Sequence, residues 1–158
     1  MRIVGITVLV FLAGIVSAQE DEARKKYEAH KARGMEIVRS GEGTITIRMA
    51  RKAGDEFSRA AKAAMAGGMY PEAIEVLRDR QTLLEKIEDT VGRLDSCRRI
   101  LEAQEKLRPK ARRERCATLL DVGHLELLAG DPAESIRVLS RAEAEYRALD
   151  DPYGVALA

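Results

Sequence analysis

The stretch from Phe57 to Leu77 reads FSRAAKAAMAGGMYPEAIEVL, and it decides the expected fold. Small and apolar residues recur in it at every third or fourth position, which is the spacing of an amphipathic helix. The pair Gly67-Gly68 follows, and glycine accepts the left-handed backbone of a helix C-terminus without steric cost. Pro71 then stands near the first turn of the next helix, where its missing N–H costs nothing. The stretch therefore predicts two antiparallel helices joined by a tight turn.

A second stretch, from Leu119 to Leu139, reads LLDVGHLELLAGDPAESIRVL. It lies 62 residues after the first stretch and repeats its pattern. The matched pairs are Phe57/Leu119, Gly68/Gly130, Glu72/Glu134, Ile74/Ile136, Val76/Val138 and Leu77/Leu139. Here Asp131-Pro132 supplies a capping side chain followed by proline at the first helical position. One hairpin leaves an apolar flank uncovered. We therefore expect two equivalent hairpins, laid side by side, that cover each other.

In the rest of the chain, apolar residues also recur at the three- and four-residue spacing of helices. Helices are expected at 20–39, 44–66, 71–107, 110–128 and 132–149. The segment 71–107 is either one long helix or two helices broken near Gly92. Residues 19–42 form a charged N-terminal helix, and 43–158 form the repeats. Because Asp150-Asp151-Pro152 opens a further helix just before the chain stops, we expect these repeats to be truncated.

The first eighteen residues have the layout of a secretory signal. Met1-Arg2 is basic, Ile3 to Val16 is largely apolar, and Val16-Ser17-Ala18 resembles a signal-peptidase site. The alternative is an uncleaved anchor, but a membrane span needs about 20 apolar residues. We therefore predict cleavage after Ala18, a periplasmic or secreted protein, and membrane contact only through the signal peptide.

Composition argues against nucleic-acid binding. The chain has 27 basic and 26 acidic residues, and loss of Arg2 leaves 26 of each. Nucleic-acid binding depends on a basic surface. The local basic run Arg108–Arg115 is interpreted as a solvated loop and helix face. We expect protein or peptide partners and no nucleic acid.

No catalytic, cofactor or metal motif is apparent. Neither His30 nor His124 has a second ligand at the spacing of a metal site, so both are interpreted as solvated or hydrogen-bonded histidines. Nucleophile elbows and phosphate-cradling loops are absent from the sequence. We expect no enzyme activity, no cofactor and no metal. Cys97 and Cys116 flank an expected helix reversal, and an oxidising compartment would permit a disulfide between them if their Cα atoms lie within about 7 Å.

The two hairpins resemble the tetratricopeptide repeat, whose helix pairs place small and bulky residues at fixed offsets. The first copy supplies Phe57, Ala60, Ala61, Ala64, Ala73 and Leu77, and the second supplies Leu119, Val122, Gly123, Glu126, Ser135 and Leu139. Ala64 and Glu126 depart from the pattern, because the repeat has an aromatic residue there. The resemblance implies an all-α fold, with antiparallel helical hairpins stacked as a short α-solenoid.

The resemblance also implies a protein–protein interaction scaffold whose first helices line a groove. The groove residues it implies are Asp55, Ser58, Lys62 and Met65 in the first unit, and Ala117, Leu120, His124 and Leu127 in the second. Two other hypotheses remain. The repeats could be the sensor region of a larger enzyme, a caspase-like protease or sensor kinase, with its catalytic domain beyond residue 158. Alternatively, a helical bundle or coiled coil assembles through Pro71–Leu107.

Overall fold

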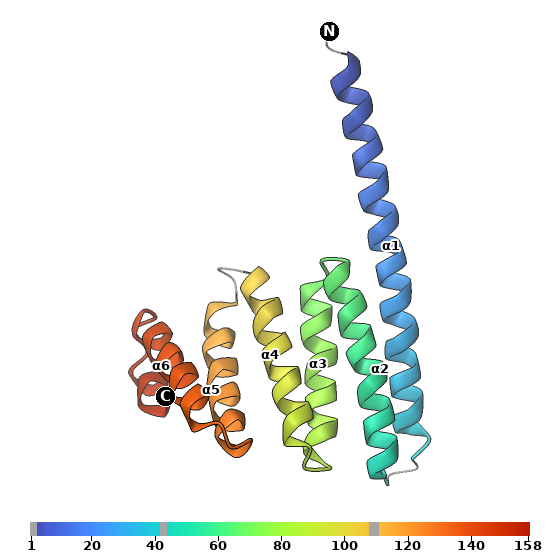
Figure 1. The fold of residues 1–158 in the computed structure, drawn as a ribbon. Helices are drawn as coiled ribbons and strands as arrows, with labels where there is room; N and C mark the ends of the chain where they lie inside the picture. The colour runs from blue at the N-terminus through green and yellow to red at the C-terminus, as the bar shows by residue number, and fades with distance from the viewer. Residues whose placement is uncertain (1–2, 42–43, 108–110) are drawn as a thin grey trace.

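The chain is all-helical, and each helix packs against the next one in sequence (Figure 1). The computed structural model describes residues 3–41, 44–107 and 111–158, with side chains from residue 18 onward except that of Tyr153. Its helices are α1 (Ile3–Arg39), α2 (Ile47–Ala66), α3 (Tyr70–Glu85), α4 (Thr90–Lys106), α5 (Arg112–Leu128), α6 (Pro132–Arg147) and α7 (Pro152–Leu157). The expected stack of antiparallel helical hairpins is confirmed.

The helices form two rows, because side chains also join helices that are two apart in the sequence. These contacts are Lys31–Glu75 (α1 to α3, 2.9 Å), Arg99–Ser58 (α4 to α2, 2.7 Å), Arg141–Glu105 (α6 to α4, 2.6 Å) and Arg113–Asp151 (α5 to the start of α7, 3.2 Å). Consequently α1, α3, α5 and α7 make up one row, and α2, α4 and α6 make up the other.

Four of the connections between helices use the same turn. Each contains one residue with a left-handed φ, namely Gly68 (70°), Glu88 (56°), Gly130 (89°) and Asp150 (53°). The N–H of the following residue donates to the carbonyl five positions earlier, which is the Schellman arrangement of a helix C-terminus. In three of the turns that following residue is an aspartate whose carboxylate caps the next helix: Asp89, Asp131 and Asp151. Short, capped turns of this kind keep successive helices antiparallel.

The 62-residue repeat is a unit of three helices, and this overturns one expectation. The unit α2–α3–α4 corresponds to α5–α6–α7, because the turns at Gly68 and Glu88 recur at Gly130 and Asp150. Since the chain reverses at each connection, an odd number of helices turns the second copy end for end (Figure 1). The prediction that the two hairpins lie side by side as equivalent units is therefore wrong. Helix α4 lies between the two hairpins. The turn of one hairpin is at the upper ends of the helices in Figure 1, and the turn of the other is at the lower ends.

The segment 71–107 forms two helices. Helix α3 ends at Glu85 and α4 begins at Thr90, so the break precedes Gly92 by a few residues. Asp89 caps α4 by accepting the N–H of Gly92 at 2.8 Å. The two helices pack against each other within the chain. Of the two alternatives for this segment, the structure therefore forms two helices and not one long helix.

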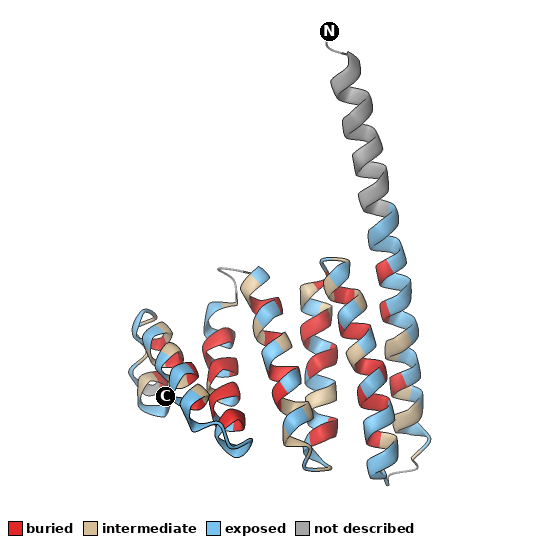
Figure 2. Ribbon diagram, viewed as in Figure 1, coloured by how far each residue is buried: buried red, intermediate tan, exposed pale blue. Residues whose placement is uncertain are grey.

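Buried apolar residues make two clusters that meet at α4 (Figure 2). The first joins α1 to α4 and includes Tyr27, Phe57 and Leu77, each 2% exposed or less. The second joins α4 to α6 around Leu119 and Val122. Buried polar side chains are concentrated in this second half: Gln104, Arg115, Thr118, Glu126 and Ser135. The α1–α4 half consequently has the larger apolar core.

Candidate partner-binding surfaces

The eight predicted groove residues do not line one groove, because α2 and α5 belong to different rows. Ser58, Lys62 and Met65 of α2 border a surface hollow whose other wall is α4. Asp55 lies about one turn before Ser58 on α2 and is exposed. Three of the four predicted α2 residues therefore line one hollow, and its second wall is α4 rather than α5.

The four α5 positions lie in the row of α1, α3 and α7. Ala117 and His124 are exposed on the outer face of α5. Leu120 is half-buried against the second apolar cluster, and Leu127 is 55% exposed. These residues do not share a groove with α2, because α5 is the third helix after α2 and therefore lies in the opposite row.

The hollow between α2 and α4 is the α2–α4 groove. It encloses about 480 Å³ and is lined by Ser58, Lys62, Met65, Asp95, Arg99 and Glu102. Asp95 already has a partner, because its carboxylate lies 2.7 Å from Arg80 Nη1. Within the described part of the chain, Lys62, Arg99 and Glu102 make no ion pair. The groove thus offers an acid, two bases and a thioether to a partner.

Arg99 is the most constrained of these side chains. Its Nη1 donates to Ser58 Oγ at 2.7 Å and its Nη2 to the Ser58 carbonyl at 3.1 Å. Loss of solvent lowers the pKa of this guanidinium. Because an arginine retains its charge under these conditions, the groove holds a partly desolvated cation in a fixed position. Sequence reasoning missed Arg99, since the pairing of α4 with α2 follows from the break at Glu88-Asp89.

Glu126 explains why an acidic residue can stand at a position where the repeat pattern has an aromatic side chain. It is 2% exposed, and its Oε1 accepts from Arg98 Nε of α4 at 3.0 Å. A buried carboxylate needs such a partner. The Arg98–Glu126 pair therefore joins α4 to α5 beside the second apolar cluster, which contains fewer buried residues than the first.

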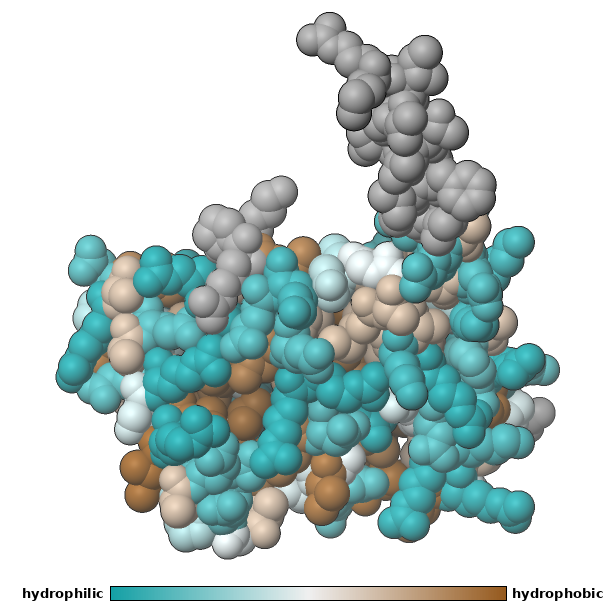
Figure 3. Space-filling view, turned by 45° about the horizontal axis from the view of Figure 1, so that its top comes forward, coloured by the Kyte–Doolittle hydropathy of each residue, from teal (hydrophilic) through white to brown (hydrophobic). Residues whose placement is uncertain are grey.

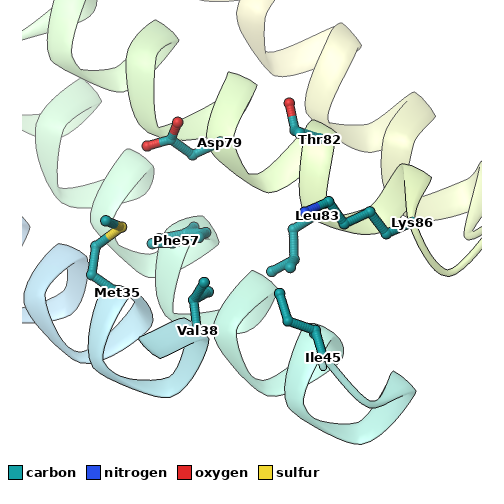
Figure 4. A pocket seen from close by; sticks show the side chains of 8 residues that line it. All are labelled: Met35, Val38, Ile45, Phe57, Asp79, Thr82, Leu83 and Lys86. Carbon is teal, nitrogen blue, oxygen red and sulfur yellow. The ribbon is translucent and has the colours of Figure 1, made fainter. Parts of the chain in front are cut away.

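A second, more apolar hollow lies between α1 and α3, with α2 as its floor (Figure 4). Its volume is about 200 Å³, and we call it the α1–α3 hollow. Met35 and Val38 of α1, Ile45 before α2, Phe57 of α2 and Leu83 of α3 supply its apolar lining, and Asp79, Thr82 and Lys86 lie on its rim. The sequence pattern does not indicate that these segments meet at a surface.

Among the side chains that the structure describes, the large apolar ones that are at least half exposed are dispersed over several helices. They are Ile47, Val91, Leu127, Leu128, Ile136 and Leu157. On the face shown in Figure 3, polar side chains predominate and apolar surface is confined to small areas. Isolated exposed apolar residues are common on soluble surfaces. The two hollows are therefore the more specific candidates for partner binding.

The disulfide that the sequence permits between Cys97 and Cys116 is not formed in this structure. Both cysteines are buried free thiols. Cys97 accepts from Gln81 of α3, whereas Cys116 donates to the carbonyl of Arg112 and lies near Glu145 of α6. From the bounds of α4 and α5, the two are about five residues out of register, or roughly 8 Å along the helix axes. That offset places them beyond disulfide geometry.

The described residues contain no group of three or more His, Cys, Asp or Glu side chains arranged to hold a metal ion. His30 is hydrogen-bonded, with its Nδ1 2.7 Å from Glu56 Oε2. Within the same residues, none of the helices combines the length and apolar character needed to cross a membrane. No known protein family, curated protein or solved structure matches this chain.

Proposed function

We propose that this chain is a protein–protein interaction scaffold of tetratricopeptide type, which binds its partner in the α2–α4 groove and acts by binding rather than by catalysis. The observation that supports this most is the fixed, partly desolvated Arg99 beside Lys62 and Met65 in a groove between parallel helices of one row. Interfaces are enriched in arginine and methionine. Arg99 needs no reordering to receive a partner, so binding would cost less conformational entropy.

The dimensions of the groove suit a peptide. Ser58 and Met65 are seven residues apart on α2, so its wall is about 10 Å long. That length matches about three residues of an extended peptide or two turns of a helix. Lys62 and Arg99 would bind acidic side chains or carbonyl oxygens, and Glu102 would select against a uniformly acidic peptide.

We propose that the protein acts outside the cytoplasm, because residues 1–18 have the layout of a secretory signal. Cleavage after Ala18 would retain the described buried side chains of α1, which begin at Ala23. Expression of the full chain, followed by N-terminal sequencing of the extracytoplasmic fraction, tests this. A mature protein that begins at Gln19 would support export, and an intact chain confined to the cytoplasm would reject it.

Peptide selection tests the proposed function. A displayed library of random peptides would be panned against residues 19–158, and the recovered peptides measured against Lys62→Glu and Arg99→Met variants. We expect at least tenfold weaker binding to both variants. Arg147→Glu, an exposed change on α6 away from the groove, is the control and should leave affinity unchanged. Peptides that bind all variants equally, or an absence of binders, would reject the groove as the partner site.

A further inference from the structure

We infer that the α1–α3 hollow is a second docking site, which receives one apolar side chain from an amphipathic helix that also carries a basic and an acidic residue. The hollow lies in the other row of helices and shares no residue with the α2–α4 groove. This inference therefore does not depend on the proposed function of that groove.

The size of the hollow identifies what can enter it. Small-molecule sites usually enclose about 300–1,000 Å³, and this hollow is smaller, at about 200 Å³. Its floor is closed by Phe57 and Leu83, which are 2% and 5% exposed, and half-buried Met35 and Val38 form one wall. A single leucine, methionine or phenylalanine side chain would fill such a space. Its burial would add apolar contact with side chains that are now partly exposed.

The rim of the hollow determines the charges of the partner. Asp79 of α3 and Lys86, which directly follows α3, lie on opposite sides of the apolar lining (Figure 4). Within the described residues, neither side chain makes an ion pair or a hydrogen bond. They are seven residues apart, about 10 Å along α3. A partner helix with a basic residue one turn to one side of its apolar residue, and an acidic residue one turn to the other side, would match both charges.

The alternative partners fit less well. An extended peptide places every second side chain on one face, so an apolar residue flanked by two charges on that face would span about 13 Å, more than the roughly 10 Å between Asp79 and Lys86. A membrane surface would favour a basic rim, whereas this rim has one acid and one base. A helix with opposite charges seven residues apart meets both requirements with one face.

Defined helical peptides provide the test. The probe is a fluorescein-labelled, alanine-rich peptide with lysine four residues before a central leucine and glutamate three residues after it. One control peptide replaces the leucine with glutamine, and another has glutamate at both charged positions. Affinities would be measured by fluorescence anisotropy with residues 19–158, and methyl NMR would locate the site through Val38, Ile45 and Leu83.

We expect the lysine–leucine–glutamate peptide to bind at least tenfold more tightly than either control and to shift those three methyl groups. In Asp79→Lys, the peptide with two glutamates should become the tighter ligand, because both rim residues are then basic. Lys62→Glu in the α2–α4 groove should not alter any of these affinities. Absence of binding by the first peptide, equal binding of all peptides, or loss of binding in Lys62→Glu would overturn the inference.

Discussion

Gly68 and Gly130 occupy the same position in two helix-ending turns of the same kind, yet the two turns lie on opposite sides of the stack. The α2–α3 turn is at the upper ends of the helices in Figure 1, and the α5–α6 turn is at the lower ends. Each has a left-handed φ, 70° and 89°, and each is followed by an N–H that donates at 2.9 Å to the carbonyl five residues earlier. Helix α5 is the third helix after α2, so the chain enters the second turn in the reverse direction. This relationship determines which helices share a surface.

The turns provide the first prediction. Gly68→Ala and Gly130→Ala should each lower the free energy of unfolding by about 1 kcal/mol or more, because an L-residue resists a left-handed φ. Glu88→Gly and Asp150→Gly should have a smaller or opposite effect, since these residues already adopt φ values of 56° and 53°. Urea unfolding measures both pairs. Equal destabilisation by all four substitutions would contradict a left-handed φ at these four positions.

Gly123 lies against Leu139 of α6, and this contact provides the second prediction. A Cβ at position 123 would fall 2.5 Å from Leu139 Cδ2, so Gly123→Ala should cost about 1–3 kcal/mol. Gly54→Ala is the matched control, because its Cβ would meet nothing closer than 3.5 Å, and it should stabilise α2 by about 0.5–1 kcal/mol. In Leu139→Ala, the added cost of Gly123→Ala should largely disappear. A persistent cost there would place the clash elsewhere.

The helices were predictable from the sequence because local signals set their ends. Gly67-Gly68, Gly130 and the prolines at positions 71, 132 and 152 act within a few residues of themselves. The break between α3 and α4 was harder to locate, because Glu88 has no sequence signature of a left-handed residue. One signal was available, since Asp89 and Gly92 recur as Asp151 and Gly154 at the same offset of 62.

The cysteines provide the third prediction. Burial raises the pKa of the Cys97 thiol to about 12 and also raises that of Cys116. Since the thiolate is the reactive form, both should resist Ellman's reagent at pH 8 in the folded protein. Two thiols should react after unfolding in urea without any reductant. Detection of fewer than two would indicate a disulfide and contradict the register of α4 and α5.

Asp79 provides the fourth prediction. Loss of solvent raises the pKa of its carboxyl, and nearby Glu75 adds to the rise. The folded state therefore holds this proton at higher pH than the unfolded state does, so the group lowers stability as pH increases through the unfolded and then the folded pKa. Asp79→Asn should raise the melting temperature at pH 7 relative to the parent, and the difference should shrink at pH 3. A difference that grows on acidification would contradict the sign.

The surfaces were less predictable than the helices, because they depend on which helices are neighbours. The α2 residues Ser58, Lys62 and Met65 follow from helix phase alone. The opposite wall of the groove, which includes Arg99, depends on the number of helices between the two repeated hairpins. The single break between α3 and α4 changes that number from even to odd. The α1–α3 hollow depends in addition on three segments meeting, which no local pattern encodes.

Helices α2 and α4, and not α2 and α5, share a groove. Cysteines placed at Lys62 and Glu102, with the buried native thiols left in place, should be joined within one chain by a short bismaleimide. The matched pair at Lys62 and His124 should remain unlinked, because these residues lie in different rows. Efficient linkage of Lys62 to His124, with none between Lys62 and Glu102, would contradict the two-row arrangement and with it the proposed groove.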